Sequence, residues 1–243
     1  MCRHVGYIGK KDLLDKLLLK KKSHSLIEMA FKPKEMENAI LNADGFGIGW
    51  NFNKQFYLYK NHMPIWNDQN LFSISSNLSS DLVIANVRSA TFNGDVNFNS
   101  SHPFKFDNFL FSHNGFIKDF DKGIKEKIIR YLEPEILVQI KGHTDSEYIF
   151  FLLIQIYKKV KNITKAILDT IKFLSNICDG LMLNLLLAVI DKNNLKLYGT
   201  KFAKSFTAPS LYYLLDNKKN IYISSEPLDK QDWKSVNNLS LLE

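Results

Sequence analysis

Short runs of apolar and β-branched residues, separated by polar turns, recur along the chain and predict strands. Before residue 112 these runs cover residues 5–8, 46–52, 56–59, 82–87 and 109–111. After residue 180 they cover residues 181–190, 195–198, 211–215 and 221–224. Turns rich in Asp, Asn and Lys join several of the later runs, as expected for neighbouring antiparallel strands.

Two longer segments, residues 147–160 and 164–177, lie between these groups and have the apolar spacing of helices. Strands, then helices, then strands again is not the regular alternation of a parallel α/β sheet. The order predicts an α+β fold in which helices lie outside two antiparallel sheets.

Two local patterns predict further helical features. Leucines spaced for one helix face, followed by three lysines, predict a short amphipathic helix over residues 13–22. Thr144 and Glu147 fit a capping box, with Thr144 as the N-cap. Asp145 then falls in the first helical turn, where the helix dipole favours an ionised carboxylate. From this motif alone, Asp145 is more simply a helix-start acid than a functional residue.

The composition excludes several classes of protein. The chain has 243 residues, of which 45% are hydrophobic, which is too many for a disordered chain. No apolar run approaches the roughly 18–20 residues needed to cross a bilayer. No linker or repeat divides the sequence, so we expect one domain over residues 2–243. Because two cysteines cannot make a disulfide framework and no basic-then-apolar leader begins the sequence, we expect a cytoplasmic protein.

The net charge of +7 raises the question of nucleic-acid binding. Only three basic residues are Arg, and the lysines are scattered among polar and apolar residues. Planar recognition of phosphates and base edges favours Arg. The simpler interpretation is a lysine-rich surface that keeps the protein soluble, so we expect no nucleic-acid partner.

Cys2 follows Met1, and its small side chain makes removal of Met1 chemically plausible. An amino-terminal cysteine would carry a thiol with a pKa of about 8.5 and an α-amine with a pKa of about 7.7–8.0. The amine can take the thiol proton, so nucleophile and base would come together without a histidine. Taken alone, a small residue after Met is ordinary.

Other polar residues lie where predicted strands end, and together they favour a catalytic role for Cys2. Arg88 offers a fork that matches a carboxylate. Asn114 offers a side-chain amide, and Gly115 offers a backbone N–H that a reacting oxygen could approach closely. Asp145 could accept a hydrogen bond from an ammonium group. Glutamine or another γ-glutamyl amide would satisfy all of these groups.

Six motifs together resemble the class II glutamine amidotransferases, a family of N-terminal nucleophile hydrolases. The order and spacing match from residue 2 to about residue 150. Each motif is weak alone, but all six occur in register. They are Cys2-Arg3-His4, Ala43-Asp44-Gly45-Phe46-Gly47-Ile48-Gly49-Trp50, Arg88-Ser89-Ala90-Thr91, Ser101-His102-Pro103-Phe104, His113-Asn114-Gly115 and Thr144-Asp145-Ser146-Glu147.

The resemblance implies a four-layer αββα sandwich with Cys2 as the nucleophile. It implies that Asn114 and Gly115 form the oxyanion hole, with Arg88 on the substrate carboxylate and Asp145 on the substrate amine. Thr91 and His102 fall on motif positions near the pocket, where we expect them to contribute to substrate binding without a chemical role.

No acceptor or synthase domain follows the motifs in this sequence. The chain therefore resembles the stand-alone subgroup that includes the γ-glutamyl hydrolase of ergothioneine synthesis. We expect an amidohydrolase that acts on a small γ-glutamyl substrate, with no metal and no cofactor, since the six histidines lack metal-ligand spacing. A membrane partner is not expected, whereas a homo-oligomer is allowed.

Two alternatives stay open at this stage. The chain could be a glutaminase subunit that supplies ammonia to a separate synthase. It could also be a catalytically silent module that binds γ-glutamyl compounds or, through its lysines, nucleic acid.

Overall fold

The computed structural model describes residues 1–19, 22–36, 41–90 and 96–243. These residues form a seven-stranded antiparallel sheet with the strand order β11-β9-β10-β1-β4-β2-β3. Its strands are β1 (Arg3–Leu13), β2 (Phe46–Phe52), β3 (Gln55–Asn61), β4 (Ser79–Val87), β9 (Tyr212–Leu215), β10 (Ile221–Ser224) and β11 (Lys234–Ser235).

A second antiparallel sheet has five strands in the order β12-β8-β7-β6-β5. Its strands are β5 (Phe104–Phe106), β6 (Phe109–Ile117), β7 (Leu181–Asp191), β8 (Asn194–Lys204) and β12 (Ser240–Leu242). The strand β7 is apolar almost without interruption, because both of its faces are buried.

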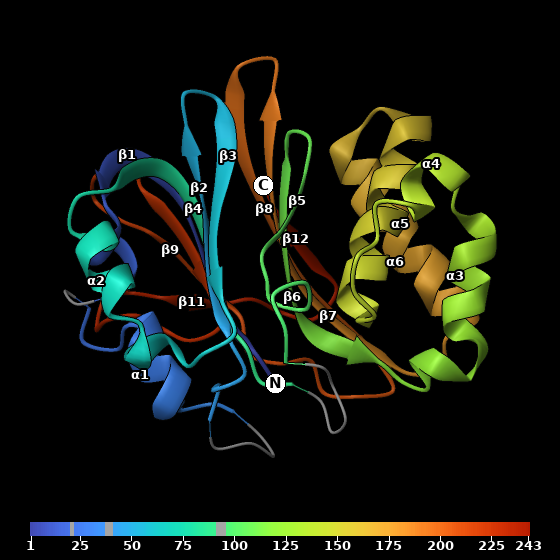
Figure 1. The fold of residues 1–243 in the computed structure, drawn as a ribbon, viewed down its shortest axis with the longest axis horizontal. Coiled ribbons are helices and arrows are strands. Elements are labelled where there is room, and N and C mark those ends of the chain that lie inside the picture. The colour runs from blue at the N-terminus through green and yellow to red at the C-terminus, as the bar shows by residue number, and fades with distance from the viewer. Residues whose placement is uncertain (20–21, 37–40, 91–95) are drawn as a thin grey trace.

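Helices cover the outer face of each sheet (Figure 1). Near the seven-stranded sheet lie α1 (Leu26–Phe31), α2 (Gln69–Ser75), the π-helical turn η1 (Asp15–Leu19) and the 3₁₀ turn η2 (Ile65–Asn67). On the side of the five-stranded sheet lie the π-helical turn η3 (Phe120–Ile124), α3 (Lys125–Tyr131), α4 (Pro134–Leu137), α5 (Asp145–Val160) and α6 (Ile163–Ile177).

Three hydrophobic clusters separate these four layers. One lies between the five-stranded sheet and its helices, a second between the other sheet and α1 and α2, and a third between the two sheets. The strand β4 contributes to two of them, because Val83 and Ala85 face the helices while Leu82 and Ile84 face the other sheet. The predicted αββα sandwich of two antiparallel sheets is therefore confirmed.

The predicted helix over residues 13–22 is wrong in type and extent. Leu13 still belongs to β1, where it pairs with Ser79 beyond an irregularity in the ladder. The helical residues that follow are the single π-helical turn η1, and Lys20 and Lys21 lie outside the described residues. Leu14, Leu17 and Leu18 are buried and Leu13 is partly buried, but sheet pairing overrides the helical spacing at the start of this segment.

Of the predicted capping box before α5, the N-cap bond of Thr144 is confirmed and the return bond of Glu147 is not. The Thr144 hydroxyl accepts a hydrogen bond from the Glu147 backbone N–H, as an N-cap does. The Glu147 carboxylate does not reach back to Thr144. It instead accepts from the backbone N–H groups of Lys141 at 2.9 Å and Gly142 at 2.6 Å, which ties the preceding loop to the helix.

One glycine of the alternating segment in β2 has a clear structural reason. A Cβ atom at Gly47 would collide with the backbone carbonyl of His102. Glycine at this position therefore lets the segment that carries His102 approach the strand closely. Over the described residues, no helix is long and apolar enough to span a bilayer.

Candidate active site

A cavity of about 500 Å³ lies where the starts of β1 and α5 meet the ends of β4 and β6. It brings together five of the predicted site residues: Cys2, Arg88, His102, Gly115 and Asp145. The rest of its lining comes from Ser89, Ala90, Ser100, His113, Phe116, Ile117, Phe120, Asp121, His143, Thr144 and Ser146. The predicted residue Thr91 lies outside the described residues.

Cys2 stands one residue before β1 and is partly buried. Because Arg3 pairs with Val87 in the antiparallel ladder, the preceding Cys2 comes beside Arg88. The Cys2 Sγ lies 3.8 Å from the carbonyl oxygen of Ser89. The pairing of β1 with β4 thus places Cys2 beside Arg88 at the cavity.

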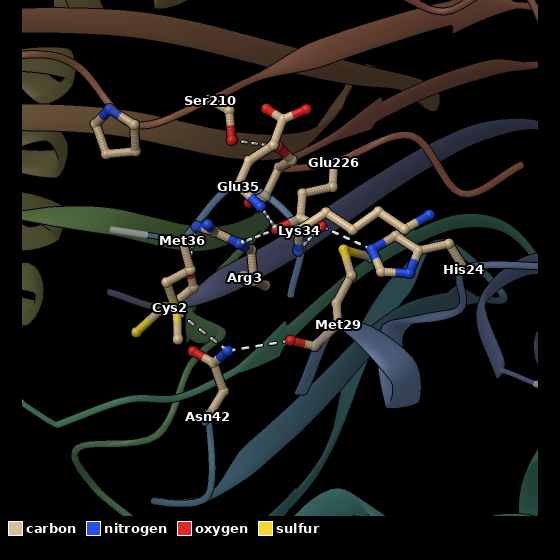
Figure 2. A network of polar contacts seen from close by, with 12 residues as sticks. Cys2, Arg3, His24, Met29, Lys34, Glu35, Met36, Asn42, Ser210 and Glu226 are labelled. Atoms are coloured by element: carbon tan, nitrogen blue, oxygen red, sulfur yellow. Dashed lines mark hydrogen bonds and ion pairs between the residues drawn. The ribbon is translucent and has the colours of Figure 1, made fainter. Parts of the chain in front are cut away.

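The start of β1 is held by a buried network around Glu226 (Figure 2). The Glu226 carboxylate accepts from Arg3 Nε at 2.7 Å, and its other oxygen lies 2.6 Å from His24 Nε2. It also accepts from the backbone N–H groups of Lys34 at 2.9 Å and Glu35 at 3.1 Å. Arg3 Nη1 in turn donates to the Cys2 carbonyl at 3.1 Å, so the network reaches the residue that carries the thiol.

The charge state of Glu226 follows from these contacts. Burial by itself opposes ionisation, but the bond with His24, the two backbone N–H donors and the Arg3 charge lower the pKa of Glu226 to about 2. The carboxylate is therefore ionised at neutral pH and balances the buried Arg3.

Sequence reasoning missed this network. One signal for it exists, because Arg3 is one of only three arginines in the chain and lies directly before a strand core. A buried arginine needs an acidic partner. Nothing local identifies Glu226 as that partner, since the two residues are 223 positions apart.

Arg88 follows β4 and is 5% exposed. Its backbone N–H donates to Gly45 O at 2.8 Å, and its carbonyl accepts from Asp44 N at 3.0 Å. The Asp44 carboxylate accepts from Ala90 N at 2.7 Å. These bonds fix the backbone on both sides of Arg88 and direct the residue to the cavity wall.

Asn114 and Gly115 lie in β6, opposite Asn184 and Leu183 of β7. Gly115 lines the cavity, and a Cβ atom at this position would collide with the carbonyl oxygen of Met182. The neighbouring Asn114 is fully buried and is not among the residues that line the cavity. Within the described residues neither of its side-chain amide atoms has a hydrogen-bond partner. Such a buried amide is costly unless a bound group supplies a partner.

Asp145 is the first residue of α5 and lines the cavity. One carboxylate oxygen accepts from Ile117 N at 2.8 Å, and the other accepts from Ser146 N at 2.7 Å. These bonds orient the carboxylate and join the helix to the end of β6. The first oxygen keeps a lone pair for a further donor, whereas the second also lies 3.2 Å from Ser146 Oγ.

Three histidines around the cavity are buried and carry no charge at neutral pH. Burial lowers the pKa of His4 to about 3 and lowers the pKa values of His102 and His113 as well. His113 Nε2 lies 2.9 Å from the Met182 carbonyl and therefore carries the proton, which leaves Nδ1 to accept from Ser146 Oγ at 2.8 Å. His102 lines the cavity and packs edge-on against Phe104, so it serves as both wall and packing residue.

A model of the family described as glutamine amidotransferases class-II matches residues 18–190. The matched segment contains Arg88, Asn114, Gly115 and Asp145. It begins after Cys2, whose place at the cavity therefore rests on the geometry above.

The matches to two curated relatives cover only part of each relative's length. The chain is 34% identical over 168 residues to the probable glutamine amidotransferase DUG3 of Saccharomyces cerevisiae, which covers 66% of this chain and 46% of that protein. It is 32% identical over 126 residues to the gamma-glutamyl-hercynylcysteine sulfoxide hydrolase of Mycolicibacterium smegmatis, covering 51% of this chain and 53% of that protein. The chain thus spans about half the length of the curated relatives it matches.

Solved structures share the fold. A glutamine aminotransferase class-II domain protein from Silicibacter pomeroyi superposes with a TM-score of 0.68 at 22% identity, over 99% of this chain and 93% of that chain. The glutamine phosphoribosylpyrophosphate amidotransferase of B. subtilis gives a TM-score of 0.59 at 16% identity, over 92% of this chain and 42% of that chain.

Proposed function

The chain belongs to the class II glutamine amidotransferases, and on that basis we propose that it is an amidohydrolase that releases glutamate from a γ-glutamyl amide through a thioester on Cys2. The observation that carries the proposal is the cavity of about 500 Å³ whose wall holds Cys2, Arg88, Gly115 and Asp145 together. The names of the two curated relatives, a glutamine amidotransferase and a gamma-glutamyl hydrolase, support the same chemistry.

Removal of Met1 would free the α-amine of Cys2, which then takes the proton of the Cys2 thiol. The thiolate attacks the γ-carbonyl carbon of the substrate and forms a tetrahedral adduct. The same amine returns the proton to the leaving nitrogen as the carbon–nitrogen bond breaks, and a γ-glutamyl thioester remains. Water then attacks the thioester, releases glutamate and restores the thiol.

The amino-acid end of the substrate, which carries the α-carboxylate and the α-ammonium, would lie between Arg88 and Asp145. The guanidinium of Arg88 pairs with the α-carboxylate, and the carboxylate of Asp145 accepts from the α-ammonium. His102 forms part of the wall around this end of the substrate. The role of Thr91 in substrate binding stays a prediction from its motif, because this residue lies outside the described residues. Both charged residues are fixed by backbone hydrogen bonds, so the pocket is formed before substrate binds.

The negative oxygen of the tetrahedral adduct would be stabilised by the Asn114 amide and the Gly115 N–H. The buried Asn114 amide, which has no partner within the described residues, fits a donor whose acceptor is the substrate. Asn114→Ala is expected to lower kcat about 100- to 1000-fold with a smaller effect on KM, because the lost bond forms in the transition state. Steady-state kinetics of glutamate release measures the loss.

Asn51→Ala is the matched control for this variant. Asn51 is another buried asparagine, which bonds to Asp81 at 2.8 Å and lies away from the cavity lining. We expect its kcat to stay within about twofold of the wild-type value, since no atom near the reaction changes. Equal losses of kcat in both variants would contradict the oxyanion role of Asn114.

The proposed function is tested on the processed chain, after mass spectrometry has established that Met1 is absent. Glutamate release is followed with glutamine and with a panel of γ-glutamyl amides. We expect at least one γ-glutamyl compound to be hydrolysed without any added protein. No release from any of them would overturn the proposal.

The same experiment decides the question of partners. Turnover of glutamine that rises on mixing with a co-purifying synthase would assign the chain as a glutaminase subunit instead. Unaided turnover would support the small γ-glutamyl substrate as the partner and would argue against a required synthase. The contacts that link Cys2 through Arg3 to Glu226 support one domain over residues 2–243. A free thiol at the cavity suits the reducing cytoplasm, where we propose that the chain acts.

A further inference from the structure

A second cavity, of about 450 Å³, lies on the other side of the amino terminus. Met1 lines this cavity, whereas the next residue, Cys2, lines the catalytic one. The remaining lining residues are Lys34, Glu35, Met36, Lys201, Thr207, Ala208, Pro209, Ser210, Tyr212 and Ser235. The first two residues of the chain therefore mark the boundary between the two cavities.

The reaction determines which side of Cys2 the leaving group takes. The nitrogen that protonates the leaving amine is the α-nitrogen of Cys2, so the two nitrogens must come within hydrogen-bond reach. In the structure this α-nitrogen is joined to Met1, which lines the second cavity. Removal of Met1 frees the amine and vacates this space in one step, which directs the leaving group toward the second cavity.

The wall of the second cavity is fixed relative to the nucleophile. The backbone N–H groups of Lys34 and Glu35 donate to the Glu226 carboxylate, which also holds Arg3 beside Cys2 (Figure 2). A shared buried anchor keeps the spacing between the thiol and this wall constant. A preformed subsite for the leaving amine, which lies beyond the scissile amide bond, requires such a constant spacing.

The charges at this cavity favour an anion. Lys34 and Lys201 both line it, and within the described residues neither has an acidic partner within 4.0 Å. Glu35 also lines the cavity, and its two carboxylate oxygens lie 2.8 and 2.9 Å from the Tyr212 hydroxyl. Two lysines against this one carboxylate leave the lining with a formal charge of 2 − 1 = +1. Burial lowers the pKa of Lys201, which a bound anion would offset.

We propose that, once Met1 is removed, the second cavity binds the leaving amine of the substrate, and that its lysines select an amine that carries a carboxylate. Such an amine is an amino acid or short peptide joined to glutamate through the γ-carboxyl group. The inference rests on the proposed function and adds to it the class of the leaving group and the residues that recognise it.

The test compares γ-glutamyl-alanine with γ-glutamyl-alaninamide, which differ only in the carboxylate on the leaving group. With the processed wild-type chain we expect a higher kcat/KM for γ-glutamyl-alanine. In Lys201→Met, which keeps the length of the side chain and removes its charge, the ratio of the two kcat/KM values is expected to fall about tenfold, mainly through KM.

Lys196→Met is the matched control. Lys196 lies on the same strand, β8, but pairs with Asp191 at 3.5 Å and is absent from both cavities. We expect it to leave the ratio unchanged. An unchanged ratio in Lys201→Met, or a wild-type enzyme that treats both substrates alike, would overturn the subsite while the proposed function stands. If γ-glutamyl-alanine, γ-glutamyl-alaninamide and glutamine all release no glutamate, the result would overturn both the subsite and the proposed function.

Discussion

Cys2→Ala is expected to abolish the release of glutamate, with kcat falling by about 10⁴-fold or more. Alanine keeps a small second residue, so Met1 can still be removed and the amine is still present. What is lost is the sulfur atom that forms the thioester, and neither the oxyanion donors nor Arg88 can replace it. Glutamate release by the processed variant, with its amino terminus verified by mass spectrometry, measures the effect.

The chain contains its own control for this prediction in Cys178. That thiol is buried beside α6, and burial raises its pKa to about 11, so it is protonated and unreactive at neutral pH. Cys178→Ala should therefore retain glutamate release, with a stability loss of about 1 kcal/mol. Substantial activity in Cys2→Ala, or in a chain that retains Met1, would refute the thioester mechanism.

The second large effect is expected for Glu226→Gln, which removes the negative charge from the buried network. Arg3 and Glu226 are both fully buried, and breaking such a pair leaves an uncompensated charge that costs about 3–5 kcal/mol. We expect the free energy of unfolding to fall by this amount, as measured by urea denaturation. Activity should fall as well, because Arg3 holds the Cys2 carbonyl.

Glu28→Gln is the matched comparison. The Glu28 carboxylate lies 3.7 Å from the other nitrogen of the same His24, but its side chain is 44% exposed. Pairs of this kind contribute little, so the variant should lose no more than about 0.5 kcal/mol. Similar losses in the two variants would show that the Glu226 network has no special part in stability.

The Glu226 prediction includes a pH dependence. The pKa of Glu226 is lowered from 4.5 to about 2, so the folded state binds this proton less readily than the unfolded chain does. The stabilisation is fully present above pH 4.5 and is lost as the pH falls toward 2. The difference in stability between wild type and Glu226→Gln should therefore shrink over that range, and a constant difference would contradict the assignment.

Long segments with a strong pattern were predictable from the sequence. Both long helices and strands such as β2 and β10 occur where the apolar spacing places them, because these segments bury a whole face. The short helices α1 to α4 and the strands β5, β11 and β12 were not predicted. Each has too few residues for a periodic signal, and contacts with neighbouring helices and strands rather than local preference stabilise it.

The candidate site was also only partly predictable from the sequence. Cys2, Arg88, Gly115 and Asp145 were found through short motifs at strand and helix ends, and the fold brings them to one cavity. Glu226 and the wall of the second cavity were not found, because they meet the amino terminus only through long-range packing. Such contacts leave no trace in the spacing of neighbouring residues.

The place of β1 between β4 and β10 has a consequence for the order in which the protein is made. A nascent chain emerging from the ribosome can pair β1 with β4 once residue 87 is exposed, whereas β10 and Glu226 follow more than a hundred residues later. Until then the buried guanidinium of Arg3 has no counterion, and the thiol is not held in place. A product that stops before residue 226 would thus carry Cys2 without the carboxylate that anchors Arg3, and we expect it to release no glutamate.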